Sequence, residues 1–194
     1  MCPVPAPITD EIVDLANRLA DCGNPSQFDL YRLDQLIQKI EKIDFAATLS
    51  FRGIYYGLKG EFCKAAEWHN QAITEYPGAY TFYNYAVTLR LEGNFEKAVA
   101  ILLRALEYAP HDIDCILGLL QCASWSGQIN LLEEWLPVYN SLEDQNLTVE
   151  EYLELIGPPL LNLQPHECYA AACASGSLSD WELAEEDEAW QHLQ

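Results

Sequence analysis

The chain carries nearly the same eighteen-residue pattern twice, with the second copy starting 33 residues after the first. Residues 60–77 read GEFCKAAEWHNQAITEYP, and residues 93–110 read GNFEKAVAILLRALEYAP. Six pairs of positions are identical: Gly60/Gly93, Phe62/Phe95, Lys64/Lys97, Ala65/Ala98, Ala72/Ala105 and Pro77/Pro110. Self-similarity at a fixed period of about 20 to 50 residues indicates an array of stacked units, each of which buries its apolar side against its neighbours.

Each unit has the pattern of two helices joined by a turn. In residues 79–112 the first half places Phe82, Tyr85 and Leu89 at the three-and-four spacing of an amphipathic helix. Gly93 then ends that helix, because glycine tolerates the left-handed conformation of a helix terminus, and Pro110 closes the second helix. We therefore predict helical hairpins over 46–78 and 79–112, and a third that starts at residue 113.

This pattern resembles the tetratricopeptide repeat, a helix-turn-helix unit of about 34 residues with a fixed set of aromatic, small, glycine and proline positions. Copies of the pattern differ in how well they match it. The matching positions are Phe82, Tyr85, Ala86, Leu89, Gly93, Ala98, Leu102, Ala105 and Pro110 in the second repeat; Leu49, Gly53, Tyr56, Gly60, Ala65, Ala72 and Pro77 in the first, with Arg52 and His69 as departures; and Ile116, Leu119, Leu120, Ala123, Gly127, Leu132 and Leu136 in the third. Because Pro137 comes early, we expect the last helix of the third repeat to end short or bend there.

The resemblance implies an all-α, right-handed helical repeat array of about three repeats over residues 46–137. Upstream, residues 1–45 are expected to form a tail and capping helices, one over about 10–21 with Thr9 as its cap and one following Ser26 and Asp29. Downstream, residues 138–194 are expected to form an acidic helical extension. Its first helix is marked by the capping box Thr148–Glu151, and further helices are expected over about 166–174 and from Ser179 onward.

Charge is distributed unevenly along the chain. The formal net charge is −20, and residues 105–194 hold 17 of the 30 acidic residues and no Lys or Arg. Such a surface repels phosphate backbones and anionic lipids, so we expect neither nucleic-acid nor membrane binding. It attracts basic proteins in a salt-sensitive manner, although net charge also serves simply to keep a protein soluble. Both interpretations remain open.

The sequence offers no recognisable catalytic, cofactor or metal site. The histidines are scattered, the pair His166 and Cys168 lacks the partner ligands of a zinc site, and no Gly-rich phosphate loop is present. The seven cysteines contain no C-x-x-C pair, and several lie within helical patterns as small apolar residues. Together with an N-terminus that lacks a secretory signal, these features predict a cytoplasmic, non-enzymatic protein without cofactors.

Tetratricopeptide arrays bind peptides in a groove lined by the first helix of each repeat, and the resemblance implies a set of groove positions here. The expected partner-binding residues are Tyr80, Tyr83, Asn84, Val87, Arg90, Leu91, Leu117, Gln121 and Trp125. The remaining groove positions hold Ala47, Ser50, Ile54, Leu58, Asp114 and Gly118. Aromatic rings with one arginine suit an extended or helical peptide with apolar anchors. The alternative is that Tyr83 and Trp125 pack against the N-terminal helices or the C-terminal extension.

Two functions are compatible with these sequence features. The first is a protein–protein interaction module, an adaptor or chaperone, which binds a segment of a partner protein in the groove. The second is an antitoxin-like or inhibitor protein, which neutralises a basic partner through its acidic half. In the second case, Trp181 and Trp190 of the extension are expected to dock into that partner. For both functions the partner is a protein or peptide, and its identity and the oligomeric state are left open.

Overall fold

A computed structural model describes residues 6–22 and 25–157 of the chain. In these residues every regular element is a helix, and no strand is present. The helices are α1 (Ala6–Cys22), α2 (Gln27–Ile40), α3 (Phe45–Leu58), α4 (Phe62–Glu75), α5 (Ala79–Glu92), α6 (Phe95–Tyr108), α7 (Ile113–Trp125), α8 (Ile129–Glu143) and α9 (Val149–Ile156). The expected all-α fold is thus confirmed for this part of the chain. The expected helices over 166–174 and beyond Ser179, with Trp181 and Trp190, lie outside the described residues.

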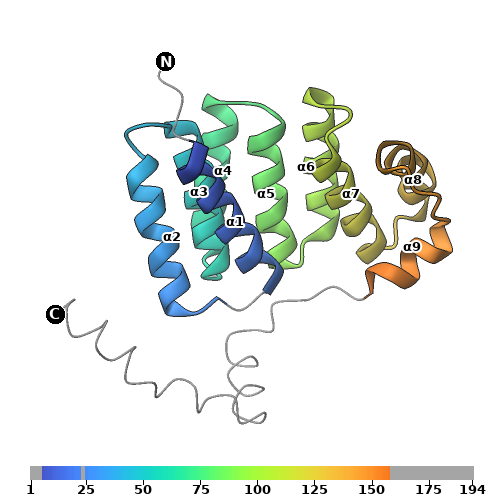
Figure 1. Cartoon of the computed structure of the whole chain (residues 1–194), viewed down its shortest axis with the longest axis horizontal. Coiled ribbons are helices and arrows are strands. Elements are labelled where there is room, and N and C mark those ends of the chain that lie inside the picture. The colour runs from blue at the N-terminus through green and yellow to red at the C-terminus, as the bar shows by residue number, and fades with distance from the viewer. Residues whose placement is uncertain (1–5, 23–24, 158–194) are drawn as a thin grey trace, which may run out of the picture. The chain divides into compact units, whose positions relative to one another are not determined.

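The helices of the three sequence units form hairpins, which lie in chain order in Figure 1. In each unit the two helices pack together: α3 on α4, α5 on α6 and α7 on α8. The units then pack on one another through the first helices, α3 on α5 and α5 on α7, and through the contacts of α4 with α5 and of α6 with α7. Each of the three sequence units therefore folds as a pair of packed helices.

Local sequence explains where these helices begin and end. Asp44 caps α3 by accepting a hydrogen bond from the backbone N–H of Ala47 at 2.9 Å, and Asp112 caps α7 in the same way through Cys115. Gly93 follows α5 with φ of 79°, and Gly60 and Gly127 stand at the matching turns with φ of 73° and 71°. Because the left-handed region favours glycine, all three hairpins turn at a glycine.

Two details at the ends of helices differ from the expectations. The first helix begins at Ala6, so Thr9 lies inside α1 and is not its cap. Of the two outcomes expected at Pro137, an early end or a bend, the early end is not observed, because the second helix of the third unit runs on to Glu143. The boundary expected at residue 137 consequently falls within α8. Proline is tolerated there because the packing of Leu132 and Leu136, both buried, holds the helix on its neighbours.

The buried side chains form two apolar clusters. The first, which we call the α5–α9 cluster, joins the buried faces of α5, α6, α7 and α8 with Tyr152 of α9. The second, which we call the α1–α5 cluster, joins α1, α2 and α3 with Val87 and Leu91 of α5. Tyr83 is partly buried and packs against both clusters. The middle helix α5 therefore links the two ends of the described fold.

Candidate functional site

The predicted groove positions lie on α3, α5 and α7, and we call this surface the first-helix face. It comprises Ala47, Ser50, Ile54 and Leu58 of α3; Tyr80, Tyr83, Asn84, Val87, Arg90 and Leu91 of α5; and Asp114, Leu117, Gly118, Gln121 and Trp125 of α7. Helical spacing puts these residues on one side of each helix. The solvent exposure of these residues differs between α3, α5 and α7, so only some of them are accessible.

The α3 part of the first-helix face is closed. Ala47, Ser50, Ile54 and Leu58 have relative exposures of 6%, 0%, 3% and 6%. The apolar members of this set belong to the α1–α5 cluster, together with Ile12, Leu15, Ala16, Leu19 and Ala20 of α1. The N-terminal helices thus cover the groove positions of the first unit.

The α5 part of the face is divided between buried and accessible residues. Asn84, Val87 and Leu91 are only 5%, 5% and 6% exposed, and Val87 and Leu91 are members of the α1–α5 cluster. Tyr80, at the start of α5, is 44% exposed, and its ring makes a T-shaped contact with the Phe51 ring at a centroid distance of 6.3 Å. Tyr83 and Arg90 are partly buried.

The α7 part of the face is the most open. Asp114 is exposed, and Leu117, Gln121 and Trp125 are partly buried. Arg90 Nη1 donates a hydrogen bond to Gln121 Oε1 at 2.7 Å, which ties α5 to α7 across the face. We therefore locate the candidate site on the accessible part of the first-helix face, formed by Tyr83, Arg90, Leu117, Gln121 and their neighbours.

Trp125 lies at the far end of this site and is held by other parts of the chain. Its Nε1–H donates a hydrogen bond to the carbonyl oxygen of Gly157 at 3.0 Å, directly after α9. Its ring also meets that of Phe95 at a centroid distance of 5.3 Å. Tyr83 likewise packs on the α1–α5 cluster. Both rings therefore pack within the chain, which was the alternative left open by the sequence. Trp125 in addition holds the end of α9 through its hydrogen bond to Gly157.

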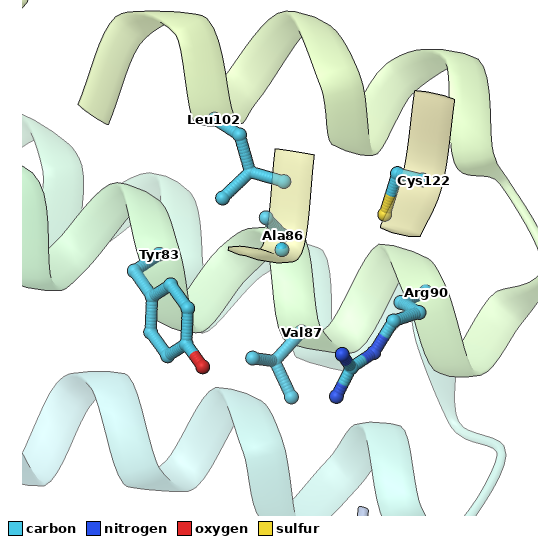
Figure 2. A pocket seen from close by; sticks show the side chains of 7 residues that line it. Tyr83, Ala86, Val87, Arg90, Leu102 and Cys122 are labelled. Atoms are coloured by element: carbon cyan, nitrogen blue, oxygen red, sulfur yellow. The ribbon is translucent and has the colours of Figure 1, made fainter. Parts of the chain in front are cut away.

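A hollow opens on the accessible part of the face, between α5 and α7, with α6 as its floor. It is a shallow depression, because its space of about 190 Å³ includes open solvent. Tyr83, Val87 and Arg90 follow one another along α5, while Leu102 and Cys122 face them from α6 and α7 (Figure 2). Ala86 and Gly118 complete the lining. The sequence had pointed to most of these positions, but it had assigned Ala86, Leu102 and Cys122 to packing alone.

Cys122 contributes a buried thiol to the lining of the hollow. Burial raises the pKa of the Cys122 thiol to about 11, so this group is protonated at neutral pH and is a poor nucleophile. The described residues contain no group of three or more His, Cys, Asp or Glu side chains that could hold a metal ion. Within the same residues, no helix is both long and apolar enough to cross a membrane.

Comparison with known proteins found no matching family model, no matching curated protein and no matching solved structure.

Proposed function

We propose that this chain is a non-enzymatic protein–protein interaction module of the tetratricopeptide type, which binds a segment of a partner protein on the accessible part of its first-helix face. One observation carries the proposal: Tyr83, which lines the hollow, and Leu117 and Gln121 of α7 remain partly exposed, whereas the positions of the first unit on the same face are closed. Apolar and aromatic side chains around a depression, with a cation beside them, are the features of a peptide-binding surface.

The test is capture of partners from the native cell by the full chain, followed by identification of the bound proteins and binding measurements with each. Leu117→Asp should weaken binding by about tenfold or more, because a charge would be desolvated at the interface. Leu142→Asp is the matched control, since Leu142 is a partly exposed leucine (42%) on α8, away from the face.

Circular dichroism and thermal unfolding should show that both variants are folded. Equal binding by Leu117→Asp and the wild-type chain would contradict the proposal. Trp125 is a poor choice for this test, because its substitution would also remove the hydrogen bond to Gly157.

A second candidate function, neutralisation of a basic partner, is favoured by the surface of α8 and α9. Every acidic side chain from residue 133 to residue 154 is exposed: Glu133, Glu134, Glu143, Asp144, Glu150, Glu151 and Glu154. No Lys or Arg lies in this stretch to neutralise them. A complex made through these groups should weaken strongly between about 50 and 500 mM salt, whereas binding through an apolar hollow should change little.

A further inference from the structure

Few groups hold helix α9 to the rest of the described fold. Tyr152 is its single buried side chain, and Val149, Leu153 and Ile156 are only partly buried where they pack on the α5–α9 cluster. Leu155 is 73% exposed. A helix of this length, 8 residues, is short of the roughly 12–15 residues at which an isolated helix becomes marginally stable in water. The helix α9 therefore depends on this small contact.

The buried contact of α9 also carries a penalty. The hydroxyl group of Tyr152 is shielded from solvent and has no hydrogen-bond partner within the described part of the chain. Burial raises the pKa of this hydroxyl group, and Tyr139 of α8 and Cys122 of α7 add to the rise, so the group lies near both helices. In water the hydroxyl group would be hydrated, so undocking of α9 restores hydrogen bonds that docking removes.

Like charges oppose the docked position as well. Glu150 and Glu154 of α9 are exposed, as are Glu143 and Asp144 at the end of α8. No Lys or Arg follows Arg104 in the sequence, so these carboxylates have no basic neighbour along the chain. Repulsion between exposed carboxylates is modest and is screened by salt, but here it adds to the penalty at Tyr152.

One hydrogen bond connects α9 to the candidate site. The carbonyl oxygen of Gly157, directly after α9, accepts the Nε1–H of Trp125 at 3.0 Å. Trp125 is the last residue of α7 and stands at the far end of the first-helix face. Because the indole ring has a single donor, docking of α9 occupies it and undocking releases it.

We propose that α9 is a latch on the candidate site: it opens as a unit while the hairpins α3–α8 stay folded, and its opening frees the indole N–H of Trp125. The first-helix face therefore has two states, which differ at Trp125. The consequence of these states for a partner rests on the proposed function, whereas the opening itself does not. Local openings of this kind involve the parts of a fold with the fewest buried apolar contacts.

Hydrogen exchange of the full-length chain, followed residue by residue by NMR, tests the latch without any partner. The amides of α9 and the indole N–H of Trp125 should have matching protection factors, about a hundredfold or more below those of the best protected amides of α5 and α6. Their exchange should respond little to urea below the unfolding transition, because the opening of α9 exposes little surface. Protection of α9 equal to that of α5, with the same response to urea, would show that α9 opens only when the whole protein unfolds.

Two substitutions at Tyr152 should shift the latch in opposite directions. Tyr152→Phe removes the hydroxyl group that lacks a partner, so it should slow exchange of the α9 amides and of the Trp125 indole by about fivefold or more. Tyr152→Ala removes the buried ring and should speed both by about tenfold or more, while the amides of α5 and α6 stay protected. The control Tyr76→Phe removes a hydroxyl group from an exposed ring (42%) after α4 and should change neither.

Unchanged or faster exchange of α9 in Tyr152→Phe would overturn the proposal. So would a Trp125 indole that does not follow the α9 amides in both variants, because the hydrogen bond to Gly157 would then not link them. No partner enters these measurements, so a failure of the latch leaves the proposed function standing. Equal partner binding by Leu117→Asp and the wild-type chain, conversely, would contradict the proposed function and leave the latch standing.

Discussion

His69 on α4 is a fully buried histidine at a position where the tetratricopeptide pattern usually has an aromatic residue. Its ring stacks on Tyr85 at a centroid distance of 5.0 Å, and Nε2 lies 2.8 Å from the Thr88 hydroxyl oxygen. A Cβ atom at Gly53 would come within 2.4 Å of the ring, so the glycine of α3 makes room for it. The histidine therefore packs α4 against both α3 and α5.

Burial determines how His69 responds to acid. Removal from water lowers the pKa of the imidazole from 6.5 to about 3, because the charged form loses its hydration. Between these two pH values the unfolded chain binds a proton that the folded chain does not. The free energy of unfolding should therefore fall as the pH falls below about 6.5, by up to about 1.4 kcal/mol per pH unit from this group alone.

The comparison protein for this prediction is His69→Phe, which keeps an aromatic ring at the site. Urea unfolding between pH 6.5 and pH 5, where most carboxylates are still ionised, should show a shallower pH dependence for the variant. Parallel pH profiles for the two proteins would mean that His69 is not neutral and buried in the folded state.

At the scale of the helix, α8 contains the strongest departure from local preference. Pro137 stands inside this helix, where it cannot donate a backbone hydrogen bond to the carbonyl group four residues earlier. The helix continues because Leu132 and Leu136 are 0% and 2% exposed and anchor it in the α5–α9 cluster. Tertiary packing has thus overridden a local signal that predicted an early end.

Pro137→Ala should accordingly stabilise the protein by about 1–3 kcal/mol, since it restores the missing hydrogen bond in a helix that is already formed. The measurement is the urea midpoint of the full chain. Ser141→Ala, at an exposed position of the same helix, should change stability by no more than about 0.5 kcal/mol. A destabilised Pro137→Ala protein would show that α8 depends on the proline for its geometry.

The short helix α9 shows the opposite case, in which the local signal was sufficient. Thr148 accepts a hydrogen bond from the Glu151 N–H at 3.2 Å, and the Glu151 side chain accepts one from the Thr148 N–H at 2.8 Å. This is the capping box expected from the sequence. Tyr152, which is 3% exposed, then places α9 against α7 and α8 within the α5–α9 cluster.

At the scale of the whole molecule, the dominant feature is a net charge of −20. The described ion pairs, including Arg32–Glu11 and Arg52–Asp34, all lie within the first 64 residues. The exposed carboxylates of α8 and α9 have no basic side chain within their own stretch of sequence. Repulsion among like charges destabilises a compact state, and salt reduces that repulsion.

Stability should therefore increase when NaCl is raised from about 50 to 500 mM, as measured by the urea midpoint. The double variant Glu150→Gln/Glu154→Gln removes a like-charged pair one helical turn apart on α9, so it should be more stable at low salt and gain less from added salt. Glu151 is left intact because it belongs to the capping box. A midpoint that falls with salt would mean that the ion pairs of the N-terminal half outweigh the repulsion.

The helical hairpins follow from local features of the sequence. Apolar spacing, the glycines at 60, 93 and 127, and the caps at Ser26, Asp44, Asp112 and Thr148 are local signals, because a helix forms and ends through contacts among residues close in the chain.

Which of the predicted groove positions are accessible depends on how distant segments of the chain pack together. Val87 and Leu91 are covered in a cluster with α1, whose residues lie some 70 positions earlier in the chain, and Trp125 is bound to Gly157, 32 positions later. Local spacing gives the direction of a side chain along its own helix, but burial depends on distant segments that pack over it. For that reason the groove positions predicted on α3 are closed, and the accessible ones lie on α5 and α7.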